Sequence, residues 1–411
     1  MPKFPYYMLC VWTFIHIGRP QDIFPFLVPF HLGDISASLT LISYFLTGQQ
    51  GEDVRTYPEI KLFFILAGYG ALCIPFGYFP RKSVEDFLFD FVFKLGLYLW
   101  LTAKLINSEE RVQGLLKTLM YSGFAMAISA IVRMGTESRV GGGGAYDPND
   151  LAMVLVTTLP IAIMQGLTAT GWLRKLICFG GGALNLLGII ATKSRGGFLG
   201  LLALGAFMMV VTLPGISRKR LILLLTTLSI VFGAYLGTEY RERIATIFEE
   251  STSDVGAGSG RVGVWRRALQ LARDHPILGV GPGAFTSAFG EYLEADKFEG
   301  DISREGIGGK WQTAHNSFLL ILAEMGIPGF IIYLVIIIRS FRNLTRAKKL
   351  ESREETSMSP SAVHATSLQM ALVGFLSCAF FLSQSYNVLL YLYFFLTSAL
   401  LRWTARERTK G

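Results

Sequence analysis

The stretch PNDLAMVLVTTLPIAIMQGLTATGWLRKLICFGGGALNLLGIIAT, residues 148–192, sets the class of fold. It holds two apolar segments, 148–168 and 172–192, joined by a short connection. A helix of about 20 apolar residues crosses the hydrocarbon core of a bilayer. The apolar residues run continuously instead of alternating with polar ones, so the segments predict membrane-spanning helices and exclude the strands of a membrane barrel.

The composition of the whole chain agrees with this prediction. Of the 411 residues, 51% are hydrophobic and only 17% are charged, whereas a soluble protein carries about a quarter charged residues. We therefore expect an all-α, polytopic integral membrane protein with about 12 transmembrane helices. The first two spans are short, and residues 22–32 between them belong to one of them or form a re-entrant turn. The predicted spans are 5–18, 34–48, 60–80, 87–106, 112–133, 148–168, 172–192, 196–213, 219–237, 315–341, 365–384 and 387–402.

The N-terminal segment and the cysteines add two expectations. The start, MPKFPYYMLCVWTFIHIGRP (1–20), has no small-residue cleavage site and is expected to form an uncleaved first span. The cysteines lie in apolar segments without CxxC spacing, which predicts buried thiols and not a disulfide framework or a metal site. They are Cys10, Cys73, Cys178 and Cys378.

The distribution of Lys and Arg predicts the orientation. Basic residues gather at 174–175, 218–220, 339–353 and 402–410, whereas the long segment 238–314 has more Asp and Glu than Lys and Arg. By the positive-inside rule, both termini are cytoplasmic and the long segment is periplasmic. The net charge of +8 thus reflects topology, and nucleic acid is not an expected partner. Three regions follow: N-terminal transmembrane helices (1–237), one large periplasmic loop containing short helices (238–314), and C-terminal transmembrane helices with a cytoplasmic tail (315–411).

Arg195 is the first candidate site residue on the outer side. It lies in ATKSRGGFLG (191–200), where the connection between two spans is nearly absent. The guanidinium fork suits phosphate oxygens, and the glycines that follow let the backbone approach a ligand closely. The alternative is an interfacial arginine that extends toward lipid headgroups.

Arg261 is the second candidate. The spacing of residues 261–273 predicts a helix with Arg261 in its first turn, where free backbone N–H groups favour an anion. Arg266 and Arg267 are expected to face solvent or headgroups, and the turn HPILGVGPG (275–283) is expected to use its glycines structurally. The expected apolar face consists of Val262, Trp265, Ala268, Leu269 and Ala272.

His315 is the third candidate, in AHNSFLLILAEMGIPG (314–329). It precedes an apolar helix on the outer side, as either an interfacial residue or a catalyst. Asn316 is a candidate helix cap. Glu324 is interpreted as structural, bonded to a neighbouring helix, and Pro328 with its flanking glycines predicts a kink or break.

The segment ESRVGGGGAYDPNDLA (137–152) lies on the same predicted side. Its glycines indicate a loop, and DPND is a signal for a capped helix start. Arg139 and Asn149 are expected to line the same outer cavity as the residues above.

Together these motifs resemble the O-antigen ligase and O-antigen polymerase superfamily of bacterial membrane glycosyltransferases. The resemblance runs in order from about residue 137 to 345, through SRGGFLG, SGRVGVW, HPILGVGPGAF and AHNSFLLILAEMGIPG. It implies an enzyme of the bacterial inner membrane that takes a glycan from undecaprenyl pyrophosphate on the periplasmic face and passes it to an acceptor hydroxyl of lipid A core, a protein or a polysaccharide.

The resemblance also assigns roles to residues. His315 would act on the acceptor, Arg195 and Arg261 would hold the donor pyrophosphate, and neither a divalent metal nor another cofactor would be required. Arg139, Asn149, Arg266 and Asn316 would line the substrate cavity. Elementary chemistry agrees, because glycosyl transfer from a pyrophosphate needs a base near the hydroxyl and cations near the leaving group. A single displacement inverts the anomeric centre.

Three alternatives stay open from the sequence. A polymerase, which extends the glycan on its own lipid carrier, shares these motifs with a ligase. A lipid or polysaccharide transporter would show charges deep in several spans and repeated halves, for which Lys94, Lys104 and Glu324 are the candidates and no repeat is visible. A purely structural subunit would leave the outward arginines and histidine without a role.

Overall fold

The computed structural model describes residues 3–48, 54, 57–134, 140–141, 146–211, 213–235, 261–295, 312–351 and 358–410. All regular structure within these ranges is helical, as predicted. The longer helices are α1 (Phe4–Gly18), α3 (Leu32–Leu46), α4 (Pro58–Cys73), α6 (Gly96–Leu105), α7 (Glu109–Arg133), α8 (Pro148–Thr168), α9 (Trp172–Thr192), α10 (Arg195–Val210), α11 (Arg218–Tyr235), α13 (Arg261–Asp274), α14 (Phe285–Glu294), α15 (Ser317–Glu351), α16 (Pro360–Ala379) and α17 (Val388–Lys410). Short helical segments are α2 (Pro20–Ile23), η1 (Pro25–Phe30), η3 (Ile74–Phe76), α5 (Pro80–Ser83) and the π-helix η4 (Val84–Leu95).

Within the described residues each predicted span overlaps helical structure, although α16 ends at Ala379, before the end of the predicted span 365–384, and the region 22–32 contains short helices. Among the described residues, seven helices are long and apolar enough to cross a membrane on their own. Two shorter apolar helices, Leu32–Leu46 and Arg195–Val210, accompany them. The described part of the predicted loop 238–314 contains α13 and α14, so short helices are present there. All four cysteines are free, and Cys10 is half-buried while the other three are buried.

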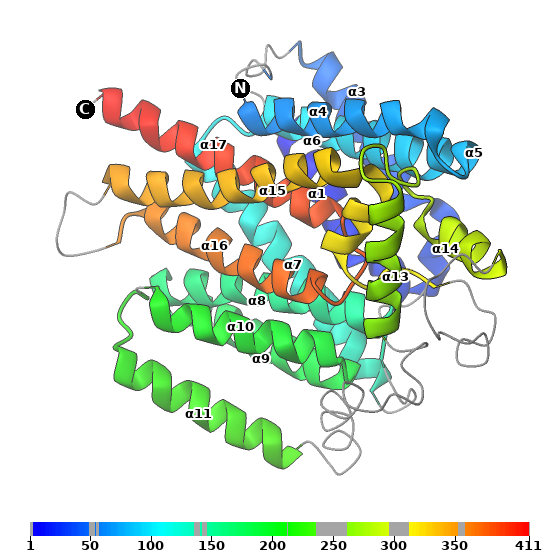
Figure 1. The fold of residues 1–411 in the computed structure, drawn as a ribbon. Helices are drawn as coiled ribbons and strands as arrows, with labels where there is room; N and C mark the ends of the chain where they lie inside the picture. Colours follow the sequence, from blue (N-terminus) through cyan, green and yellow to red (C-terminus); the bar gives the residue numbers. More distant parts are fainter. Residues whose placement is uncertain are drawn as a thin grey trace.

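Helix α8 lies in the centre of the bundle. It is apolar on all sides, and residues 151–162 are buried throughout, as expected for a helix surrounded by protein. Figure 1 shows α8 between α16 and the pair α9 and α10. Helix α10 approaches α8 closely because Gly197 has no side chain: a Cβ atom there would lie 2.5 Å from Cβ of Ala152.

Helix α15 breaks at Gly326, whose φ of 64° is left-handed, which confirms the kink expected from GIPG. The turn after α13 fills this break. The N–H of Ile327 donates to the carbonyl of Pro276 (2.8 Å), and the N–H of Val280 donates to the carbonyl of Ala323 (2.9 Å). Gly279 has a φ of 64°, and a Cβ there would collide with the backbone of Glu324. The structural role predicted for these glycines is therefore confirmed.

Glu324 fixes the same junction. It is 2% exposed, and its carboxylate accepts hydrogen bonds from the N–H of Phe285 (3.0 Å), at the start of α14, and the hydroxyl of Tyr386 (2.6 Å). This geometry confirms the structural interpretation of Glu324, which joins α15 to α14 and to the segment before α17.

Two expectations about α13 are wrong in detail. Ala268 and Ala272 are buried as expected, but Val262 and Leu269 are exposed, and Val264 and Leu271 are buried in their place. Arg267, expected to face solvent or headgroups, is 1% exposed and lies with its Cζ 5.4 Å from the ring centroid of Phe289 in α14. The helix is turned so that α14 and α15 cover this face and the aromatic ring accommodates the guanidinium.

Candidate active site

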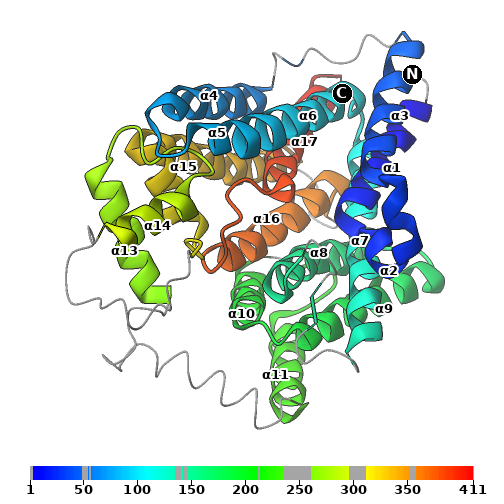
Figure 2. The same cartoon turned by 90° about the vertical axis from the view of Figure 1, so that its right-hand side faces the viewer.

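The candidate residues that the structure describes lie at one end of the bundle. Helices α8, α10, α15 and α17 begin there, α16 ends there, and α13 lies alongside. Figure 1 shows this end on the right, with the C-terminal end of α17 on the left, and Figure 2 views the bundle from that end.

Arg195 is positioned by a tight connection between α9 and α10. Lys193 takes a left-handed conformation with φ 47°, and Ser194 caps α10 by accepting a hydrogen bond from the N–H of Gly197 (3.1 Å). The Ser194 hydroxyl also donates to Oδ1 of Asn149 in the first turn of α8 (2.8 Å). The starts of α8 and α10 are thereby joined, and half-buried Arg195 follows directly. The nearly absent connection predicted from the sequence is confirmed.

The start of α8 is capped as DPND predicts. Oδ1 of Asp147 accepts from the backbone N–H groups of Asn149 (2.6 Å) and Asp150 (2.8 Å). Oδ1 of Asp150 in turn accepts from Nε2 of Gln384 (2.6 Å). The first turn of α8 therefore contacts both α10 and the segment between α16 and α17.

That segment, residues 380–387, forms the middle of the site. Cζ of Arg261 lies 5.8 Å from the ring centroid of Phe381. A Cβ atom on Gly196 would lie 3.4 Å from Cβ of Phe381. Phe381 thus contacts the helix start that carries Arg195 and also supports Arg261, at the start of α13. It brings the two predicted phosphate-binding residues to the same segment.

His315 is held by the same segment. Its backbone is left-handed, with φ 46°, and its N–H donates to Oγ of Ser383 (2.9 Å). The Ser317 hydroxyl donates to the carbonyl of Leu382 (2.6 Å) and accepts from the N–H of Gln384 (2.8 Å). Several bonds therefore fix the start of α15 against residues 382–384.

Asn316 is buried and caps α15, as the sequence indicates. Its Oδ1 accepts from the N–H groups of Phe318 (2.9 Å) and Leu319 (3.0 Å). Its side-chain oxygen is therefore engaged in the cap.

The electrostatic surroundings of His315 favour a neutral imidazole. Burial lowers the pKa of His315, the positive charge of Arg261 lowers it further, and the carboxylate of Asp147 opposes both. Arg261 and Asp147 therefore act electrostatically on the histidine. An imidazole that is neutral near pH 7 can accept a proton.

The remaining candidates are placed differently. Arg266 is exposed on α13. Arg139 lies outside the described residues. Within the described ranges, no group of three or more His, Cys, Asp or Glu side chains could hold a metal ion.

Phe381, Ser383 and Gln384 contribute to the site but are not among the residues predicted from the sequence. The predicted span 365–384 covered them, but α16 ends at Ala379 and the connection begins at residue 380. The polar cluster SQSYN (383–387) is a turn signal that identifies this connection.

Two family models match the chain. Residues 180–334 match a model described as O-Antigen ligase, and this range contains Arg195, Arg261 and His315. Residues 2–159 match a family of unknown function (DUF5935). None of the curated proteins matches the sequence.

Proposed function

Because the chain belongs to the O-antigen ligase superfamily through residues 180–334, we propose that it is a membrane glycosyltransferase of the ligase type. It transfers a glycan from undecaprenyl pyrophosphate to an acceptor hydroxyl of lipid A core, a protein or another surface polysaccharide. One observation carries the proposal: Phe381 and Ser383 hold Arg261 and His315, from separate helix starts, beside the start of α10 that carries Arg195.

In the proposed reaction, His315 is the general base. Its neutral imidazole accepts the proton of the acceptor hydroxyl, and the oxygen attacks the anomeric carbon of the donor glycan. The bond between that carbon and the pyrophosphate oxygen breaks, and its electron pair leaves with the pyrophosphate, which stays on the lipid carrier. Attack from the side opposite the leaving group inverts the anomeric centre. No cofactor takes part in this scheme.

Arg195 and Arg261 stabilise the departing pyrophosphate. Charge-assisted hydrogen bonds from guanidinium groups to phosphate oxygens are among the stronger polar contacts in proteins. Arg195 is the first residue of α10, where backbone N–H groups also favour a negative charge. Asn149, Asn316, Arg139 and Arg266 are the further candidates for lining the substrate cavity.

The proposed location is the bacterial inner membrane, with the site facing the periplasm and both termini in the cytoplasm. The excess of Lys and Arg at 174–175, 218–220, 339–353 and 402–410 supports this orientation. With the site at the outer face, the lipid tail of the donor stays in the bilayer while its pyrophosphate reaches the arginines.

The test is a product assay with purified protein. The protein receives an undecaprenyl-pyrophosphate glycan together with a lipid or protein acceptor, and mass spectrometry identifies where the glycan is found. Glycan on the separate acceptor supports the ligase. Longer chains on the same carrier would identify a polymerase that uses the same site. Absence of transfer to any acceptor, with movement of the donor across a vesicle membrane, would favour a transporter instead.

A further inference from the structure

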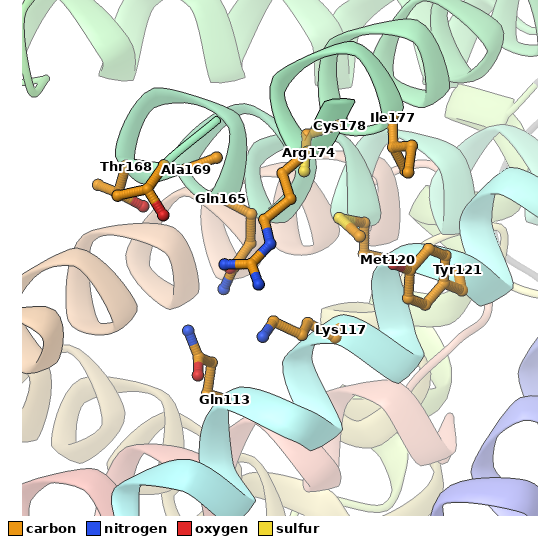
Figure 3. A pocket seen from close by; sticks show the side chains of 11 residues that line it. Gln113, Lys117, Met120, Tyr121, Gln165, Thr168, Ala169, Arg174, Ile177 and Cys178 are labelled. Carbon is orange, nitrogen blue, oxygen red and sulfur yellow. The ribbon is translucent and has the colours of Figure 1, made fainter. Parts of the chain in front are cut away.

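A polar cavity lies at the other end of the bundle, where α8 ends and α9 begins. It has a volume of about 270 Å³ and is walled by α7, the end of α8 and the start of α9. Figure 3 shows the side chains of Gln113, Lys117 and Arg174 pointing into the same space, with Gln165 beside them. Asn149 in the candidate active site and Gln165 here are 16 residues apart on α8, or roughly 24 Å along the helix axis. The cavity is therefore separate from the candidate active site.

The lining of the cavity is cationic and lacks a countercharge. Lys117 and Arg174 contribute two positive charges, and none of the described lining residues is Asp or Glu. Gln113 and Gln165 add amide N–H donors and Thr170 adds a hydroxyl group, whereas the Thr168 hydroxyl donates to the carbonyl of Met164 (2.9 Å). Ammonium, guanidinium, amide and hydroxyl donors around one space suit the oxygens of a phosphate group. Two like charges at one cavity also favour occupation by an anion.

The surroundings of the cavity distinguish a lipid from a soluble anion. Helices α8 and α9 are both long and apolar enough to span a membrane, so their junction lies at a membrane surface. Ile177 lines the cavity and is exposed, and Leu173 and Leu176 on the same helix are exposed as well. Trp172, which is 75% exposed, begins α9 at the depth where tryptophan side chains collect in membrane proteins. The polar cavity thus opens beside an apolar surface that would contact acyl chains.

We propose that this cavity binds the phosphate headgroup of an anionic phospholipid. The phosphate is held between Lys117 and Arg174, the amides of Gln113 and Gln165 bind its remaining oxygens, and the acyl chains lie along the exposed apolar face of α9. Basic pockets between transmembrane helices bind acidic headgroups by this chemistry. The inference does not depend on the reaction proposed for the opposite end of the bundle.

The test measures lipid retention by the full-length protein in detergent. Native mass spectrometry follows phosphatidylglycerol and phosphatidylcholine with matched acyl chains, added separately. We expect wild-type protein to retain one phosphatidylglycerol selectively. The double variant Lys117→Gln/Arg174→Gln is expected to bind phosphatidylglycerol with an affinity at least about tenfold lower, because each cation near an anionic lipid contributes to affinity.

The matched control is Lys175→Gln/Lys219→Gln. It removes the same charge from two exposed residues that do not line the cavity, and it should retain phosphatidylglycerol as the wild type does. A charge-preserving variant, Lys117→Arg/Arg174→Lys, should also retain the lipid, and thermal unfolding of each variant verifies the fold. Equal retention by the double variant and the wild type, or equal retention of both lipids, would overturn the proposal. Displacement of the lipid by inorganic phosphate at the same concentration would overturn the assignment to a lipid and identify a soluble anion site.

Discussion

The backbone N–H of His315 donates a hydrogen bond to Oγ of Ser383, 68 residues further along the chain, at 2.9 Å. His315 has a left-handed backbone conformation (φ 46°), which is uncommon for residues other than glycine. The bond to Ser383 and the cap of α15 by Asn316 hold this conformation. The position of the proposed base thus depends on a segment between two distant helices.

Removing the Ser383 hydroxyl should therefore reduce transfer. We expect Ser383→Ala to lower turnover about fivefold, since one neutral hydrogen bond contributes about 1 kcal/mol. Ser383→Thr, which keeps the hydroxyl, should stay close to wild type. Ser217→Ala is the control, because the Ser217 hydroxyl also accepts a backbone N–H bond, from Arg220 at the start of α11 (3.4 Å), away from the site. A loss in Ser217→Ala equal to that in Ser383→Ala would show that the effect is not specific to His315.

The pH dependence of transfer should follow the imidazole of His315. Only its neutral form accepts a proton, so activity should rise with pH and level off once the residue is deprotonated. Burial and Arg261 lower the pKa of His315. The rising limb of the pH–rate profile should therefore have its midpoint below the ordinary histidine pKa of about 6.5.

Two substitutions should move that limb in opposite directions. Arg261→Gln removes the positive charge that lowers the pKa of His315, so the limb should move to higher pH. Asp147→Asn removes the carboxylate that raises this pKa, so the limb should move to lower pH, while the asparagine still caps α8. The midpoint of the pH–rate profile is the readout, and an unchanged midpoint in both variants would argue against His315 as the titrating base.

Phe381 should strengthen donor binding by supporting Arg261. A cation–π contact at a partly exposed site contributes about 0.5–1 kcal/mol, so Phe381→Leu should raise the KM for the donor roughly two- to fivefold. Phe381→Tyr keeps the aromatic face and should behave as wild type. A change in acceptor KM without a change in donor KM would contradict this role for Arg261.

The contact between Gly197 and Ala152 should limit the size of residue 197. Gly197→Ala places a methyl group 2.5 Å from Cβ of Ala152, and overpacking of this kind costs about 1–3 kcal/mol. Thermal unfolding should show the loss, with partial recovery in Gly197→Ala/Ala152→Gly. Gly180→Ala on α9 is the control, because no atom lies within 4 Å of a Cβ built there. Equal melting temperatures for Gly197→Ala and Gly180→Ala would refute the tight α8–α10 contact.

Local signals allowed the helices and several details to be predicted. Continuous apolar runs identify the helices, Asp147 and Asn316 act as the caps expected, and GIPG breaks α15 as expected. Each of these depends on residues adjacent in sequence, which is why they can be read without a structure.

The remaining features depend on tertiary contacts. Phe380, Phe381 and Leu382 continue the apolar run of α16, so hydropathy places its end several residues too late and conceals Ser383. Arg267 is buried because the ring of Phe289 covers it, and nothing near Arg267 in sequence indicates that partner. The convergence of Arg195, Arg261 and His315 on one segment likewise requires the packing of several helices.

The most direct test of the central claim is the rate of glycan transfer by His315→Ala under single-turnover conditions with saturating donor. General-base catalysis contributes about 10²- to 10⁴-fold, so the variant should lose at least about a hundredfold in rate while keeping its melting temperature. The matched control is His31→Ala, because His31 is exposed and shares the left-handed conformation, with φ 46°. Transfer by His315→Ala at the rate of the wild type and of His31→Ala would contradict the assignment of His315 as the base.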